Sequence, residues 1–133
     1  MHFTENELTV AVAAAAKSVL AAQRKDVRKG KTSIDDVWQA MDRHERYKLL
    51  KAMGSQVLPV LAALPDVEVS PGERPTFTQD EIAAAVGDSL DEGAGGKLRR
   101  KVVLTARVAI IQAALAQLPP RADPDAFVVP DSL

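Results

Sequence analysis

A six-residue pattern occurs twice in this chain, and it constrains the fold because each copy predicts the start of a helix. The pattern is Phe-Thr-x-x-Glu-aliphatic, at residues 3–8 and again at 77–82. In each copy the Thr hydroxyl can accept a hydrogen bond from the backbone N–H three residues later, and the Glu can accept one from the Thr N–H. The Phe and the aliphatic residue can then pack together as a hydrophobic staple. We therefore expect helices to begin after Thr4 and Thr78.

The two regions that follow these starts also end alike. Leu-Ala-x-Leu-Pro occurs at 61–65 and at 115–119. Two shared patterns in the same order favour two related halves, although each pattern alone is common and two copies are fewer than a solenoid needs. The predicted organisation is a single helical domain of residues 1–120, made of a half at 1–65, a Pro- and Gly-containing linker at 66–76 and a half at 77–120, followed by a C-terminal arm at 121–133.

Composition places the chain among ordinary globular domains. It has 133 residues, of which 47% are apolar and 26% charged, with a net charge of −1 and no cysteine. This balance argues against a disordered chain, and the lack of cysteine excludes disulfides and thiolate metal sites. The N-terminus is acidic and the alanine run at 13–16 stops at Lys17, so we expect neither a signal peptide nor a membrane partner, and a cytoplasmic location.

The first half is predicted to form three helices, at about 5–29, 34–41 and 43–64. Gly30 suits the end of the first helix, and Thr32 or Ser33 can cap the second. Asp42 can cap the third, so we expect a bend before Arg43. Pro59 lies inside the third helix and removes one backbone hydrogen bond, which predicts a kink or a break near 55–58.

The second half is predicted to be a helical hairpin. One helix is expected from about Gln79 to Asp91, a glycine-rich turn at 92–96, and a long helix from Lys97 to Leu118. The resulting fold class is all-α: a helical bundle of about five helices in two pseudo-repeated halves, the second an antiparallel helical hairpin, with an extended C-terminal arm.

Residues suited to catalysis or metal binding are few and scattered. Neither His2 nor His44 lies in an H-E-x-x-H or related spacing. Asp35 and Asp36 are consecutive, so on a helix they point about 100° apart and do not share a site. We expect no catalytic residue, no metal ligand and no cofactor, and therefore a protein that is not an enzyme.

The glycine-rich turn before Lys97 lacks the spacing of a phosphate-binding P-loop, but it leads into a helix start beside a cluster of cations. Backbone N–H groups at a helix N-terminus attract anions. The predicted anion site comprises Gly95, Gly96, Lys97, Arg99, Arg100 and Lys101. The alternative, which we favour, is that these cations pair with Asp88, Asp91 and Glu92 at the end of the preceding helix.

The last helix carries the strongest indication of function, because it is apolar on almost every side. A helix of this kind is buried on every side, either at the centre of its own bundle or between its bundle and a second subunit. The arm adds an apolar triplet at 127–129, which we expect to dock in a groove between helices of its own chain or of another copy. The predicted interface residues are Val103, Val108, Ile111, Leu115, Phe127, Val128 and Val129.

The function predicted from the sequence is a non-catalytic helical module for protein–protein interaction or assembly, acting as a homo-oligomer or with a protein partner. The alternative is a small DNA- or phosphate-binding regulator that uses the basic clusters. The turn at 30–33 joins two helices among basic residues, loosely as in a helix-turn-helix. The near-zero net charge and the acidic start of the following helix make nucleic acid the less favoured partner.

Overall fold

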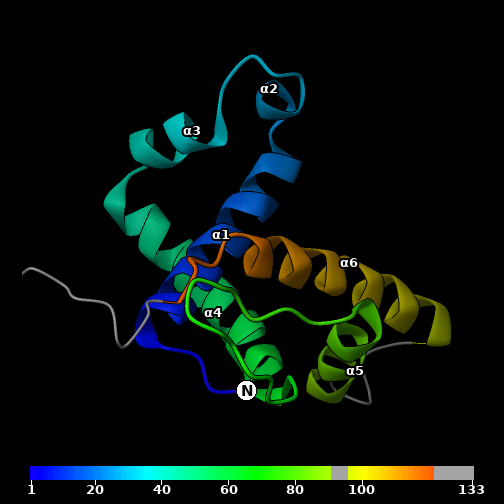
Figure 1. The fold of residues 1–133 in the computed structure, drawn as a ribbon. Helices are drawn as coiled ribbons and strands as arrows, with labels where there is room; N and C mark the ends of the chain where they lie inside the picture. The colour runs from blue at the N-terminus through cyan, green and yellow to red at the C-terminus, as the bar shows by residue number, and fades with distance from the viewer. Residues whose placement is uncertain (91–95, 122–133) are drawn as a thin grey trace, which may run out of the picture.

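The computed structural model describes residues 1–90 and 96–121, and within them the chain is all-α, with six helices and no strand (Figure 1). The helices are α1 (Glu5–Gln23), α2 (Lys25–Arg28), α3 (Ile34–Ala40), α4 (Arg43–Ala63), α5 (Gln79–Ser89) and α6 (Lys97–Ala116). The all-α prediction is confirmed for this part of the chain. The ends of α5 and α6 fall within two residues of the predicted ends.

Both predicted capping boxes are present. At the start of α1, the Thr4 hydroxyl accepts from the Glu7 N–H at 3.1 Å and a Glu7 carboxylate oxygen accepts from the Thr4 N–H at 2.9 Å. At the start of α5 the same two bonds join Thr78 and Glu81, at 3.1 and 2.8 Å. The phenylalanines that precede the two caps also meet, with ring centroids 6.4 Å apart. The starts of α1 and α5 therefore lie side by side.

The first predicted helix is interrupted. α1 ends at Gln23, and Arg24 adopts an extended backbone before the short helix α2 begins. The Arg24 guanidinium binds both carboxylate oxygens of Asp26, at 3.2 and 3.0 Å. The predicted stop at Gly30 is confirmed: its φ is +74°, its N–H donates to the Val27 carbonyl, and the next N–H donates to the Asp26 carbonyl. These are the bonds of a Schellman helix end, which favours glycine at the left-handed position.

Ser33, one of the two residues predicted to cap α3, is its N-cap. The Ser33 hydroxyl accepts a hydrogen bond from the Asp36 N–H at 3.1 Å. The predicted bend before Arg43 is also present, because Met41 and Asp42 lie outside both α3 and α4. Of the two outcomes predicted at Pro59, a kink or a break, the break is absent, since α4 continues through Pro59 to Ala63. Pro59 is exposed, and buried core residues lie on both sides of it along the helix, so packing holds α4 together despite the missing hydrogen bond.

The core lies between α1, α4, α5 and α6. Each of these helices contacts two of the others, α1 with α4 and α6, and α5 with α4 and α6 (Figure 1). α2 and α3 extend away from this core at the top of Figure 1, and none of their residues is fully buried. The buried apolar residues are Ala11, Ala15, Ala16, Met53, Val57, Val60, Leu61, Leu64, Ile82, Ala85, Val86, Val108, Ile111, Ala114, Leu115 and Leu118.

The linker between α4 and α5 is irregular, as predicted, and it is tied to the end of the described chain. The Gly72 N–H donates to the Arg121 carbonyl at 2.8 Å, and the Arg121 N–H donates to the Glu73 carbonyl at 2.8 Å. Gly72 has a φ of +83°, which allows the tight turn that presents its N–H. Arg121 is thus held by backbone bonds, while residues 122–133 lie outside the described residues.

Candidate functional site

α6 is not buried on every side within its own chain. Leu98 is 77% exposed and Val102 is 61% exposed, and the outer face continues with Thr105, Ala109 and Gln112, all exposed. The first of the two alternatives, a central helix enclosed by its own bundle, is therefore wrong. Alanine explains only part of this exposure: Ala106 and Ala109 carry so little apolar area that they can face water at small cost, whereas Leu98 and Val102 are large apolar side chains.

The predicted interface residues of α6 lie on its inner side. Val108, Ile111 and Leu115 are 7%, 2% and 8% exposed and belong to the core, and Val103 is half-buried. A second chain could reach the first three only if the bundle opened. The other three predicted interface residues, Phe127, Val128 and Val129, lie outside the described residues.

The predicted anion site is only partly described. Gly96 is the N-cap of α6, and Lys97, Arg99, Arg100 and Lys101 are all exposed. Arg100 donates to the Gly87 carbonyl across the turn, at 3.4 Å.

Gly95, Asp91 and Glu92 lie outside the described residues. Asp88 is exposed, and among the described residues no ion pair joins it to the cations at the start of α6. The structure therefore gathers these four cations on the first turns of α6.

A groove lies between α1 and α4 and is lined mainly by apolar side chains. It has a volume of about 750 Å³ and is open to solvent. Leu58 on its wall is 41% exposed, although leucine is usually buried. Tyr47, one helical turn before the groove on α4, is 61% exposed. The lining residues of this α1–α4 groove are Glu5, Leu8, Thr9, Val12, Leu50, Lys51, Gly54, Ser55, Leu58 and Pro59.

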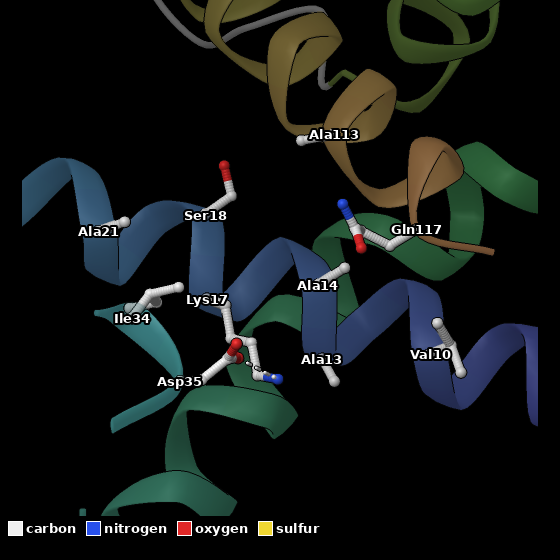
Figure 2. Close-up of a pocket in the computed structure, with 10 residues that line it drawn as sticks. All are labelled: Val10, Ala13, Ala14, Lys17, Ser18, Ala21, Ile34, Asp35, Ala113 and Gln117. Atoms are coloured by element: carbon white, nitrogen blue, oxygen red, sulfur yellow. Dashed lines mark hydrogen bonds and ion pairs between the residues drawn. The ribbon is translucent and has the colours of Figure 1, made fainter. Parts of the chain in front are cut away.

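A second groove of about 480 Å³ lies on another side of α1, between the start of α3 and the end of α6. Figure 2 shows α1 crossing this groove, with Ile34 and Asp35 on one side and Ala113 and Gln117 on the other. The lining residues of this α1–α6 groove are Val10, Ala13, Ala14, Lys17, Ser18, Ala21, Ile34, Asp35, Ala113 and Gln117.

At the edge of the α1–α6 groove, Lys17 of α1 is held by two residues of α3. Lys17 Nζ is 3.2 Å from a carboxylate oxygen of Asp35 and 5.7 Å from the centre of the Trp38 ring. An ammonium group over an aromatic face is stabilised by the ring electrons. Neither groove could be predicted from the sequence, because each combines residues far apart in the chain.

Within the described residues, an ion pair between Glu7 and Arg121 is partly buried, and its partners could not be predicted from the sequence. Glu7 is 3% exposed, and its carboxylate accepts from Arg121 Nε at 3.2 Å and from Arg121 Nη2 at 3.1 Å. The same Nη2 donates to the His2 carbonyl at 3.1 Å. Burial alone would raise the pKa of Glu7. Hydrogen bonds from Arg121 and from the Thr4 N–H, together with the Arg121 charge, outweigh burial and hold that pKa below its ordinary value.

His2 and His44 are both exposed. Within residues 1–90 and 96–121, no group of three or more His, Asp or Glu side chains is placed to hold a metal ion. In the same ranges, no helix is both long enough and apolar enough to cross a membrane.

Comparisons with protein families, with curated proteins and with solved structures give no match for this chain.

Proposed function

We propose that this chain is a non-catalytic helical interaction or assembly module that associates with itself. The observation that supports this proposal best is the α1–α4 groove, an open apolar surface between two helices of the core. An exposed leucine on a groove wall gains free energy when a partner covers it, at about 25 cal/mol for each Å² of apolar area removed from water. Contiguous apolar surface of this kind is typical of interaction sites.

The groove has neighbours that would extend an interface. Leu58 and Tyr47 lie on the same stripe of α4, since they are eleven residues apart, or about three helical turns. Tyrosine is enriched at interfaces, because its ring is apolar and its hydroxyl tolerates water.

We also propose that the two halves are related repeats and that the second is an antiparallel hairpin. Matching capping boxes at Thr4 and Thr78 support the first point. Arg100 near Gly87, and Ile82 in a hollow with Leu115, support an antiparallel course of α5 and α6. In this proposal the arm at 121–133 docks on its own chain or on another copy.

Size-exclusion chromatography with light scattering tests self-association directly. The full chain should show a mass above that of one chain, falling toward it as the protein is diluted from about 1 mM to about 1 μM. The mass of one chain is 14.2 kDa. A mass that stays at this value at every concentration would contradict the proposal.

The competing proposal is a small DNA- or phosphate-binding regulator. It is supported by Lys97, Arg99 and Lys101, which are exposed on the first turns of α6. A heparin column separates the two proposals, because binding to phosphates weakens steeply as salt is added. Retention that is lost when these three residues are changed to glutamine would favour the regulator. Elution at low salt, together with a concentration-dependent mass, would favour the assembly module.

A further inference from the structure

We infer that the α1–α4 groove binds the same groove of a second copy of this chain, across a two-fold axis that reverses the second copy end for end. This inference rests on the proposed self-association and names the surface that performs it. The charged residues of the groove, and where they lie along it, point to a second copy rather than to another partner.

The direction of the two helices establishes which residues lie at each end of the groove. The amino nitrogen of Met1 donates to the Leu64 carbonyl at 2.6 Å, so the start of α1 lies at the end of α4. Farther along, a Cβ built on Gly54 would lie 4.0 Å from a methyl group of Val12. As the residue number rises along α1 it falls along α4, and the two helices are therefore antiparallel.

It follows that the two charged residues of the groove stand at opposite ends. Glu5 lies at one end with Leu58 and Pro59, and Lys51 lies at the other, nearly two turns earlier on α4. Both side chains are exposed, and neither forms an ion pair within the described residues. The groove therefore has an acidic end, an apolar middle and a basic end.

A surface with this layout is complementary to itself. In a two-fold dimer the same patch is used by both copies, and an axis that crosses the groove exchanges its ends. Glu5 of each copy then faces Lys51 of the other, and the apolar walls around Leu8 and Leu58 cover one another. A groove with charges of the same sign at both ends would repel the groove of a second copy in this arrangement.

Charge reversal tests the inference in the full-length protein. Glu5→Lys and Lys51→Glu should each raise the dimer dissociation constant at least about tenfold, because each change places two pairs of like charges across the interface. The double variant Glu5→Lys/Lys51→Glu exchanges the ends and should return the dissociation constant to within about threefold of the original. A lysine near the start of α1 destabilises that helix, because the helix dipole disfavours a cation there. The double variant carries the same lysine, so a recovered dissociation constant cannot be explained by a more stable helix.

A matched pair of leucine variants tests the apolar part. Leu58→Lys should abolish the dimer, whereas Leu98→Lys should leave it intact, although Leu98 is the more exposed of the two. Circular dichroism on each variant confirms that it is folded.

The outcomes separate the inference from the proposed function. A wild-type chain that is monomeric at every concentration overturns both. A dimer whose dissociation constant is unchanged by the charge reversals and by Leu58→Lys overturns the inference alone. That result is the one expected if residues 122–133, or a different protein, cover the groove.

Discussion

Replacing Arg121 by methionine is the most informative single change, because Arg121 neutralises the only buried charge among the described residues. Methionine keeps much of the length and apolar volume of the side chain but cannot donate hydrogen bonds. The variant leaves the Glu7 carboxylate with only the contacts from Thr4, chiefly the bond from its backbone N–H at 2.9 Å. It also removes the donor to the His2 carbonyl.

The expected loss follows from the burial of the two partners. Removing one member of a fully buried ion pair costs about 3–5 kcal/mol. The Arg121 side chain is 28% exposed, however, so water can reach part of the gap it leaves. We therefore expect a loss of about 2 kcal/mol in the free energy of unfolding, within the range of a hydrogen bond to a charged group. For a domain of this size that loss corresponds to a fall of about 8 °C in Tm.

The dependence on pH gives the sharper assay. The folded-state pKa of Glu7 lies below its ordinary value of 4.5, so the ion pair stabilises the fold above about pH 4.5 and this contribution is lost as the pH falls further. Urea unfolding of the wild type and of Arg121→Met should therefore differ most at neutral pH. The difference should shrink as the pH is lowered below that value, where Glu7 becomes protonated in the unfolded chain.

Arg74→Met is the matched control. Arg74 donates to the Ala116 carbonyl at 2.8 Å from an exposed position, and within residues 1–90 and 96–121 it forms no ion pair. The Arg74→Met variant should lose little free energy of unfolding, and this loss should not change with pH. Equal losses for the two variants at every pH would refute the assignment of a stabilising charge pair between Glu7 and Arg121.

Three other predictions concern the fold. Thr4→Ala and Thr78→Ala should each lower the free energy of unfolding by about 1 kcal/mol in urea titrations, because each removes a side-chain cap; no loss at either site would contradict the capping geometry. Gly54→Ala should raise the stability of the monomer by up to about 1 kcal/mol, measured in dilute solution, since the new Cβ meets only ordinary contacts at 3.8 and 4.0 Å inside a helix; a loss would show that the space between α1 and α4 cannot hold a methyl group at this position. Leu61→Ala should cost about 2–5 kcal/mol at a position 1% exposed, whereas Leu98→Ala, 77% exposed, should change the unfolding midpoint little.

A chain that ends at Pro120 loses more than the arm. It lacks the Glu7 contact and also the two backbone bonds that Arg121 makes with Gly72 and Glu73. A lower Tm for that chain would therefore not report on residues 122–133 alone. Ending the chain after Arg121 is the appropriate truncation.

Features coded by neighbouring residues could be predicted from the sequence. The capping boxes at Thr4 and Thr78 and the stop at Gly30 each depend on side chains or backbone angles within a few positions. The interruption at Arg24 is also local, but no proline or glycine lies between Ala21 and Lys29 to signal a break.

Features that depend on distant residues could not be predicted. Glu7 and Arg121 are 114 positions apart, and the residues around each of them give no indication that the two side chains pair. The exposure of the outward face of α6 could not be predicted for a different reason. The sequence pattern shows which positions of a helix are apolar, but it does not show on which sides other helices pack. Both grooves also depend on distant residues, because each forms where side chains from separate helices meet.

The position of α2 and α3 outside the core has a thermodynamic consequence. None of their residues is fully buried, and the chain is extended at Arg24 and at Met41, on either side of the pair. A segment with so little buried area can open at a free energy below that of global unfolding, as a cooperative unit of its own. Ile34 and Asp35 form one wall of the α1–α6 groove, so each opening removes that wall. A molecule that binds in this groove would therefore favour the closed position of α2 and α3. By reciprocity, the factor by which binding favours closure equals the factor by which closure raises the binding affinity.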